Sequence, residues 1–542
     1  MKKIKFSIAI LAFTLFSCDQ YLDINDSPND LTFDKATPSK LLPGAEVSTY
    51  RVQVGAMNQL GNVFMNSWTR NVSSFGNGYD KELQLIIDNA FYNNIWDGLY
   101  LNIMNFQAII DYPNPSGKYD YYVAAAKICK AHYMQYVVDL YGDAPYSKAW
   151  KPGTISTPSY DDDYAVYQDL IANLEDARNL IINADPAVAE DIAPFDVMLA
   201  GDMNAWTEFA NTIQLRMCLR MSKATGAVGT FRDTKLNDIA GGPFLSANVT
   251  INPGFSNAND DQASPGFNTY AIDASGTARQ NRTFIAQTAH VYKAMATYAN
   301  TNYPAAGSQE IIAGSGVFYP NVTDARRARL FTNGVGATGP RGVEQGNSFV
   351  TVGPPSLTYP GTPSRLGIAG NFNMYLEHPG GTLADYNTGS GYIMTVYESY
   401  FLQAEAALRY PSLFSNAQGN FNSGVTESFT SRGATIGTYL TTVNATKPNF
   451  GFNVANTFNQ NLHAIMYQKW VALMGHHGIE SFIDYNRTGF PLTPLSLTAT
   501  QANKPYRLSY PVSEYIANAA NVLPLSNSDI FTINSKSPFW LQ

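Results

Sequence analysis

The chain has 542 residues, of which 45% are hydrophobic and 13% aromatic but only 14% charged, and its formal net charge is −8. The charged fraction lies well below the usual quarter, so Tyr, Asn, Ser, Thr and Gly must supply much of the surface polarity. The acidic balance excludes the basic surface that nucleic acid requires. Clear linkers are absent, which favours one large folded unit.

The N-terminus has the layout of a secretory signal peptide. Three lysines in the first five residues precede an apolar run over residues 8–16, which is too short to cross a bilayer as a helix. The residues that end at Cys18 are similar to a bacterial lipobox. We therefore predict a signal peptide over residues 1–17, acylation of Cys18 and a lipidated polar tether over residues 18–31. The alternative is an ordinary signal peptide cleaved nearby, with an incidental cysteine.

Helical periodicity dominates the next part of the chain. Apolar stripes with a helical period cover residues 95–110, 125–140, 167–181 and 206–217. Gly142 is placed to end the second of these helices, and the three aspartates before the third favour a helix start. Antiparallel helix pairs predict a mainly α fold with a tetratricopeptide-like scaffold over about residues 32–225, although no sequence repeat of that period is present.

The composition then changes to one rich in Gly, Asn, Ser, Thr and Pro. We predict a loop-rich subdomain with few short strands over about residues 226–390, and expect it to bind the ligand because long structured loops are usually functional. Helical patterns return at residues 392–409 and 462–475, so the scaffold is expected to resume over about residues 391–490. The last part, residues 491–542, is expected to wrap the surface.

The mature chain retains two cysteines, Cys129 and Cys218, in helical segments. No spacing typical of zinc ligands is present. We expect both cysteines to be buried thiols. A single disulfide between them is the alternative, because the predicted compartment is oxidising.

The sequence contains no catalytic or cofactor-binding motif in the structural context that such a motif requires. Gly334, Gly336 and Gly339 match a dinucleotide fingerprint by letters, but Pro340 follows at once and no helix begins there. The chain contains no nucleophile elbow, metalloprotease motif or phosphate-binding loop. We therefore predict no catalytic residues and no cofactor.

Two polar clusters contain residue types that can bind metal ions. His476 and His477 with Glu480 suggest ligation, but adjacent histidines point in different directions, and solvated side chains at a helix end are the preferred interpretation. Residues 257–261 offer oxygens to calcium but lack the glycine and terminal glutamate of an EF-hand loop, which favours a polar turn. We predict no metal site.

Several segments match the sequence motifs of one known family, in the same order along the chain. They are Tyr21–Asn25 with Ser27–Asn29, Asp139–Tyr146, Tyr397–Arg409, Gln468–Leu473 with Glu480 and Asp484–Pro491, and Arg507–Pro511. These segments resemble the SusD/RagB-like outer-membrane lipoproteins, in particular the starch-binding, outer-membrane-associated branch. Lys130, Tyr410 and Asn486 depart from the pattern, which has Arg, Gly and Arg at these positions.

The resemblance implies that residues 32–542 form a single SusD-like domain. It also implies a non-catalytic lipoprotein of the cell outer membrane that is exposed at the cell surface, captures an oligosaccharide or a peptide, and delivers it to a SusC-like TonB-dependent transporter. A surface glycoside hydrolase and a structural or adhesive surface protein are the alternatives. Glu405 and Arg487 are interpreted as polar partners in helix packing.

Sugar binding requires flat aromatic faces with amides nearby. Trp96, Trp206 and Trp470 lie in helical stripes and are interpreted as core. The candidate ligand-binding residues lie in a Gly- and Ser-rich loop and in the irregular region, and they are Trp68, Phe75, Asn77, Tyr79, Tyr270 and Tyr319. Buried packing is the competing interpretation of Trp68, because large aromatic side chains are mostly interior.

Overall fold

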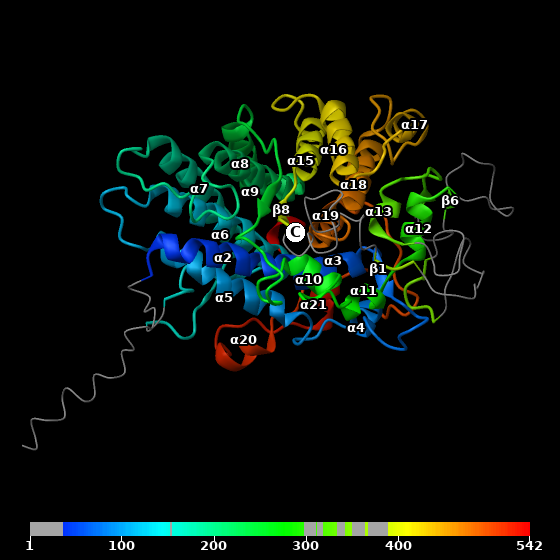
Figure 1. The fold of residues 1–542 in the computed structure, drawn as a ribbon, viewed down its shortest axis with the longest axis horizontal. Coiled ribbons are helices and arrows are strands. Elements are labelled where there is room, and N and C mark those ends of the chain that lie inside the picture. The colour runs from blue at the N-terminus through cyan, green and yellow to red at the C-terminus, as the bar shows by residue number, and fades with distance from the viewer. Residues whose placement is uncertain are drawn as a thin grey trace, which may run out of the picture.

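The computed structural model describes residues 36–151, 154–297, 310–311, 318–332, 342–348, 364–366 and 389–542 (Figure 1). The predicted signal peptide and tether, with Cys18, lie outside the described residues, as does the segment from Gly334 to Gly339. Within the described residues, no helix combines the length and the apolar character that a membrane crossing requires.

The N-terminal part is a stack of helices in which consecutive members pack against each other. Its elements are α2 (Pro38–Val52), the π-helical turn η3 (Gln53–Met57), α3 (Asn58–Phe64), α4 (Asp80–Gln84), α5 (Asn93–Ile110), α6 (Asp120–Tyr141), α7 (Asp163–Asn183), α8 (Met203–Arg220), η4 (Met221–Lys223) and α9 (Gly226–Ile239). The predicted stripe of α5 is confirmed, since Ile95, Leu99, Ile103 and Phe106 are fully buried.

The predicted helix boundaries in this part follow from local chemistry. Gly142 ends α6 with φ +71°, a conformation that costs glycine little. Asp162 caps α7, because its side chain accepts a hydrogen bond from the backbone N–H of Ala165. The helical periodicity therefore predicted the buried faces of these helices, and the capping residues predicted the end of α6 and the start of α7.

A second group of helices follows the irregular part. It comprises α15 (Val396–Arg409), α16 (Ala417–Ser431), α17 (Tyr439–Thr446), α18 (Phe458–Leu473) and α19 (Gly478–Thr488). Thr395 caps α15, and Thr457 forms a capping box with Gln460 at the start of α18. In Figure 1 α15, α16 and α17 lie along one edge of the molecule, and α18 and α19 run from there towards its centre.

The part between the two helical groups is irregular. The described residues contain four two-stranded antiparallel pairs, of which β2 with β3 lies within the N-terminal part and β1 with β5 links that part to the irregular one; the other two are β4 with β8 and β6 with β7. The strands are β1 (Trp68–Arg70), β2 (Ala144–Pro145), β3 (Tyr160–Asp161), β4 (Val249–Ile251), β5 (Ile285–Gln287), β6 (Glu310–Ile311), β7 (Phe318–Tyr319) and β8 (Gly391–Met394). Short helices α10 (Pro265–Tyr270), α11 (Gln280–Phe284), α12 (Ala289–Met295) and α13 (Arg327–Leu330) lie between β4 and β8 in the chain. The predicted mainly α fold with few short strands is confirmed.

The longest helix described in the predicted loop-rich part, α9, was missed by the sequence analysis, as were the short helices α10 to α13. Residues 226–239 were assigned to the loop-rich part, but they form the regular helix α9. Only Gly229, Leu236 and Ile239 of this helix are buried, so it carries too few apolar positions to show a stripe.

The C-terminal segment carries α20 (Val512–Ala517), α21 (Asn527–Phe531) and the terminal turn η5 (Phe539–Leu541). It runs back along the N-terminal helices: Leu508 N donates to Leu140 O at 2.7 Å, and Phe539 N donates to the Asp163 carboxylate at 2.8 Å. Trp540 is 1% exposed, so this segment adds to the core as well as wrapping the surface.

Candidate functional site

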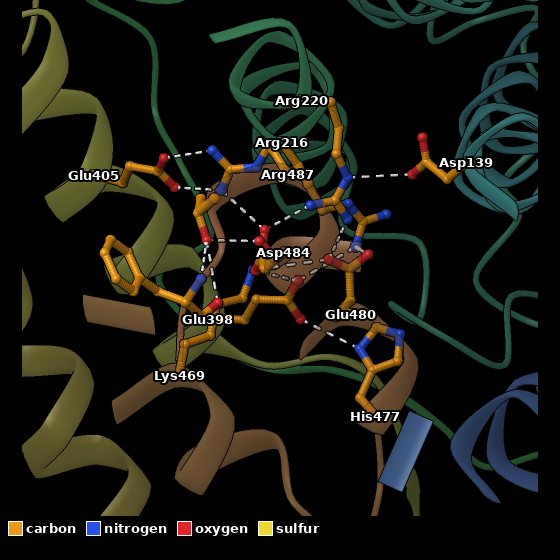
Figure 2. A network of polar contacts seen from close by, with 12 residues as sticks. Asp139, Arg216, Arg220, Glu398, Glu405, Lys469, His477, Glu480, Asp484 and Arg487 are labelled. Carbon is orange, nitrogen blue, oxygen red and sulfur yellow. Dashed lines mark hydrogen bonds and ion pairs between the residues drawn. The ribbon is translucent and has the colours of Figure 1, made fainter. Parts of the chain in front are cut away.

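The centre of the fold contains a buried network of charged side chains (Figure 2). Arg220 of α8 contacts three carboxylates: Asp139 at 3.2 Å, Glu480 at 2.5 Å and Asp484 at 2.7 Å. Arg216, one turn earlier, reaches Glu480 at 3.2 Å. These side chains are at most 2% exposed, so the helices α6, α8 and α19 are joined by ion pairs that water does not screen.

The network extends from α19 to α15 and α18 of the second helical group. Arg487 forms two bonds to Glu405, at 2.6 and 2.8 Å, and a third to Asp484 at 2.9 Å. Lys469 of α18 lies 2.9 Å from Asp484 and 3.7 Å from Glu398. The predicted partnership of Glu405 and Arg487 in helix packing is confirmed.

Burial and charge compete for the ionisation of these groups. Burial alone would raise the pKa of Glu480, but Arg216, Arg220 and Lys469 outweigh it and hold that pKa well below its usual value. The pKa of Asp484 is lowered against burial in the same way. These carboxylates stay ionised and paired, whereas a general acid needs a raised pKa and access to substrate. The network is therefore built to hold helices together.

His476 and His477 belong to this buried region. They are 2% and 1% exposed, so the expectation of solvated histidines was wrong. His477 Nδ1 lies 3.3 Å from Glu398 and its Nε2 lies 3.0 Å from Tyr136 Oη, while Arg432 donates to His476 Nδ1 at 3.1 Å. The turn after α18 folds inward because these polar partners compensate the loss of water.

The predicted aromatic platform divides into buried and accessible members. Trp68 is 0% exposed and Tyr270 is 1% exposed, and their rings meet edge to face at 5.2 Å. Tyr270 Oη donates to the carbonyl oxygens of Val54 and Gly55. Strand β1, which carries Trp68, pairs with β5. The position of Trp68 in this structure therefore agrees with the competing interpretation, which is packing in the core.

The remaining candidates divide in the same way. Tyr79 is 8% exposed, and Tyr319 is 1% exposed with its hydroxyl 2.9 Å from His290 Nδ1. A covered ring presents no face to a sugar, so neither can stack on a ligand in this conformation. Phe75 is half-buried and Asn77 is exposed. The structure thus leaves Phe75 and Asn77 as the candidates that a ligand can reach.

A cavity of about 250 Å³ opens in the irregular part. The described residues that line it are Ala278, Arg282, Thr283, Thr332, Arg365 and Leu366. Its walls are joined through the backbone, since Thr332 N donates to Arg365 O at 2.9 Å and Arg365 pairs with Ala286 of β5 in an antiparallel bridge. The sequence analysis did not single out these residues, because they come from three separate segments and carry no motif.

The cavity adjoins the loop that carries Phe75 and Asn77. Asn71 Nδ2 donates to Thr283 O at 2.9 Å, and the rings of Phe75 and Phe284 meet at 5.1 Å. Gly78 has φ +134°, and a Cβ there would lie 2.4 Å from the Phe284 ring. The loop therefore packs closely on α11, beside the wall of the cavity.

One acidic group has the spacing of metal ligands. Oxygens of Asp143, Asp162 and Asp163 lie within 4.8 Å of one another. Burial, followed by the charge of Asp143, raises the pKa of Asp163 to about 7. Each carboxylate already accepts a backbone N–H, from Asp163, Ala165 and Phe539 respectively. The geometry is explained by the start of α7 and the attachment of the C-terminal segment.

Two further expectations agree with the structure. Cys129 and Cys218 are buried free thiols, and burial raises the pKa of both. Residues 257–261 form an exposed polar turn in which Asp260 pairs with Arg279 at 2.6 Å.

Comparison with solved structures identifies the same fold in proteins of low sequence identity. A chitin-binding SusD homolog from Flavobacterium johnsoniae has 21% identity and a TM-score of 0.65, with 89% of this chain and 94% of that chain covered. A SusD homolog from Parabacteroides distasonis has 18% identity and a TM-score of 0.69, with coverages of 94% and 98%. A SusD homolog from Bacteroides uniformis has 19% identity and a TM-score of 0.63, with coverages of 95% and 100%.

Comparison by sequence gives the family. No curated protein is significantly similar to the chain. The SusD-like family described as "starch-binding associating with outer membrane" matches residues 28–297 and 355–511, which is most of the sequence. The chain therefore belongs to the SusD-like family.

Proposed function

We propose that this protein is a non-catalytic, cell-surface lipoprotein that captures an oligosaccharide and delivers it to a SusC-like TonB-dependent transporter of the outer membrane. The observation that carries the proposal is the family match over residues 28–297 and 355–511, since that family is described as starch-binding and associated with the outer membrane. The chitin-binding description of the Flavobacterium johnsoniae homolog supports a glycan as the ligand class.

The ligand is proposed to bind at the surface made by the loop of residues 71–79 and the neighbouring cavity. Phe75 offers an accessible part of an aromatic ring and Asn77 an exposed amide, the two kinds of group that sugar recognition uses. The paired, closed carboxylates of the central network support a binding role over hydrolysis.

A binding and turnover screen tests this function. The full chain in mild detergent is titrated with neutral and acidic oligosaccharides and with peptides, and the glycans are then analysed for cleavage. We expect binding of at least one oligosaccharide without cleavage. Hydrolysis would favour the glycosidase alternative, and binding of peptides alone would reject the glycan assignment.

The anchor and the transporter need separate experiments. Cys18→Ala should release the protein from the outer membrane or leave its signal peptide uncut, and unchanged fractionation and fatty-acid labelling would contradict acylation. Purification from native membranes in mild detergent should recover a TonB-dependent transporter with the protein. A protein recovered alone, while the transporter is intact in the same membranes, would contradict the delivery role.

A further inference from the structure

Two arginines of the cavity lack the partners that other arginines have. Arg282 of α11 and Arg365 are both half-buried. Among the residues that the structure describes, neither guanidinium makes a hydrogen bond or an ion pair. Burial, followed by the charge of Arg365, lowers the pKa of Arg282. Two cations therefore share one wall of the cavity at an energetic cost.

The composition of the chain makes this arrangement unusual. Asp and Glu number 43 against 35 Lys and Arg, so carboxylates are in excess. Arg279, on the segment just before α11, pairs with Asp260 at 2.6 Å, and Arg326 pairs with Asp324 at 2.6 Å. Partly buried charges are normally paired because desolvation is costly. Two unpaired arginines in one cavity are expected at a binding site whose ligand supplies the anionic group.

The lining specifies the chemistry of that ligand. A planar guanidinium binds two oxygens of one anionic group, which suits a carboxylate or a sulfate. Leu366 and Ala278 add apolar wall, and Thr283 and Thr332 add hydroxyl groups. A volume of about 250 Å³ is near the lower end of small-molecule sites, so it suits one sugar residue and not a long chain segment.

We infer that Arg282 and Arg365 bind the carboxylate or sulfate of one acidic residue in the captured oligosaccharide, so that the protein selects acidic over neutral glycans. This inference rests on the proposed glycan-binding function and specifies its ligand class. The loop on α11 places Phe75 beside the cavity, where its ring can contact the next sugar of the same chain. The two arginines thus bind the acidic sugar unit through its charge, and the ring of Phe75 contacts the adjacent sugar unit.

The test compares ligands that differ only in charge. The full chain in mild detergent is titrated calorimetrically with a galacturonic acid tetramer and its methyl ester, and with a sulfated carrageenan tetrasaccharide and its desulfated form. Maltotetraose and chitotetraose serve as neutral glycans, and an acidic peptide as a non-glycan anion. The variants are Arg282→Gln and Arg365→Gln. Arg279→Gln is the matched control, because it removes a nearby positive charge that is already paired and does not line the cavity.

We expect at least tenfold tighter binding of one acidic glycan than of its neutral form, and loss of that preference in Arg282→Gln and Arg365→Gln but not in Arg279→Gln. The pair that shows the preference distinguishes carboxylate from sulfate. Equal binding of charged and neutral forms, or a preference that survives both substitutions, overturns the inference and leaves glycan capture intact. Binding of the acidic peptide with no glycan bound overturns both. Thermal melting of each variant confirms that it is folded.

Discussion

The central network and the cavity both place arginines away from bulk water, but in opposite ways. In the network Arg220 contacts three carboxylates, and in the cavity Arg282 and Arg365 line one wall with no anionic partner among the described residues. The carboxylates of the network fall within the segments that identify the family, as do Lys469 and Arg487, whereas the cavity residues lie in no recognisable motif. The difference indicates that the family motifs record how the fold is held together, and that ligand choice is encoded elsewhere.

The largest expected effect comes from breaking the network at its centre. Glu480→Ala removes the carboxylate that Arg216 and Arg220 share and leaves both cations buried without it. We expect a loss of about 3–5 kcal/mol in the free energy of unfolding, measured by denaturant titration. Asp176→Ala is the control, since it breaks the exposed pair with Lys127 and should cost at most about 1 kcal/mol. Similar losses in the two variants would contradict a structural role for the network.

A second prediction compares the two aromatic residues of the loop. Trp68→Ala should cost about 3–5 kcal/mol of stability, because Trp68 is 0% exposed and its removal leaves a cavity in the core. Phe75→Ala should leave stability nearly unchanged and weaken glycan binding by about 1–3 kcal/mol. Unfolding and binding titrations on both variants test this. A folded Trp68→Ala variant that loses only ligand affinity would show that the platform includes Trp68.

The network should also respond to acid through His132. Arg216 donates to His132 Nδ1 at 3.0 Å, so this ring must be neutral in the fold, and burial followed by Arg216 holds its pKa well below the usual value. Below about pH 6.5 the unfolded chain therefore binds more protons than the folded one. The contribution of neutral His132 to the free energy of unfolding is fully present above about pH 6.5. It decreases as the pH falls below that value, by up to about 1.4 kcal/mol per pH unit.

His132→Asn keeps a hydrogen-bond acceptor for Arg216 but removes the titrating ring. Denaturant unfolding between pH 7.5 and roughly pH 5 should therefore show a shallower pH dependence in this variant than in the unchanged protein. Equal slopes would contradict a neutral His132 as a source of acid sensitivity.

The helices could be predicted from the sequence because their signals are local. The stripe from Ile95 to Phe106, the glycine at 142 and the aspartate at 162 each act within one or two turns. Helix α9 was missed because only three of its residues are buried. The motifs also predicted the contact of Glu405 with Arg487, although these residues are far apart in the sequence.

The candidate site was harder to predict because its determinants depend on distant pairing. Trp68 lies in a polar loop sequence, but it pairs with Gln287 across the β1–β5 ladder and is thereby covered. Arg282 and Arg365 are brought to one cavity by the bridge between Ala286 and Arg365. No local pattern in a single sequence reports such pairings, so the accessible residues could not be separated from the buried ones.

The account is tested most directly by the unfolding free energies of Arg220→Met and Arg282→Met, measured in one denaturant series. Both variants replace an arginine by a similarly long apolar side chain. We predict a loss of about 3–5 kcal/mol for Arg220→Met, which leaves three carboxylates without their cation. For Arg282→Met we predict no loss beyond about 0.5 kcal/mol, or a small gain, because it relieves repulsion with Arg365. Comparable losses of unfolding free energy in the two variants would contradict the account, in which the network stabilises the fold and the two arginines of the cavity bind a ligand.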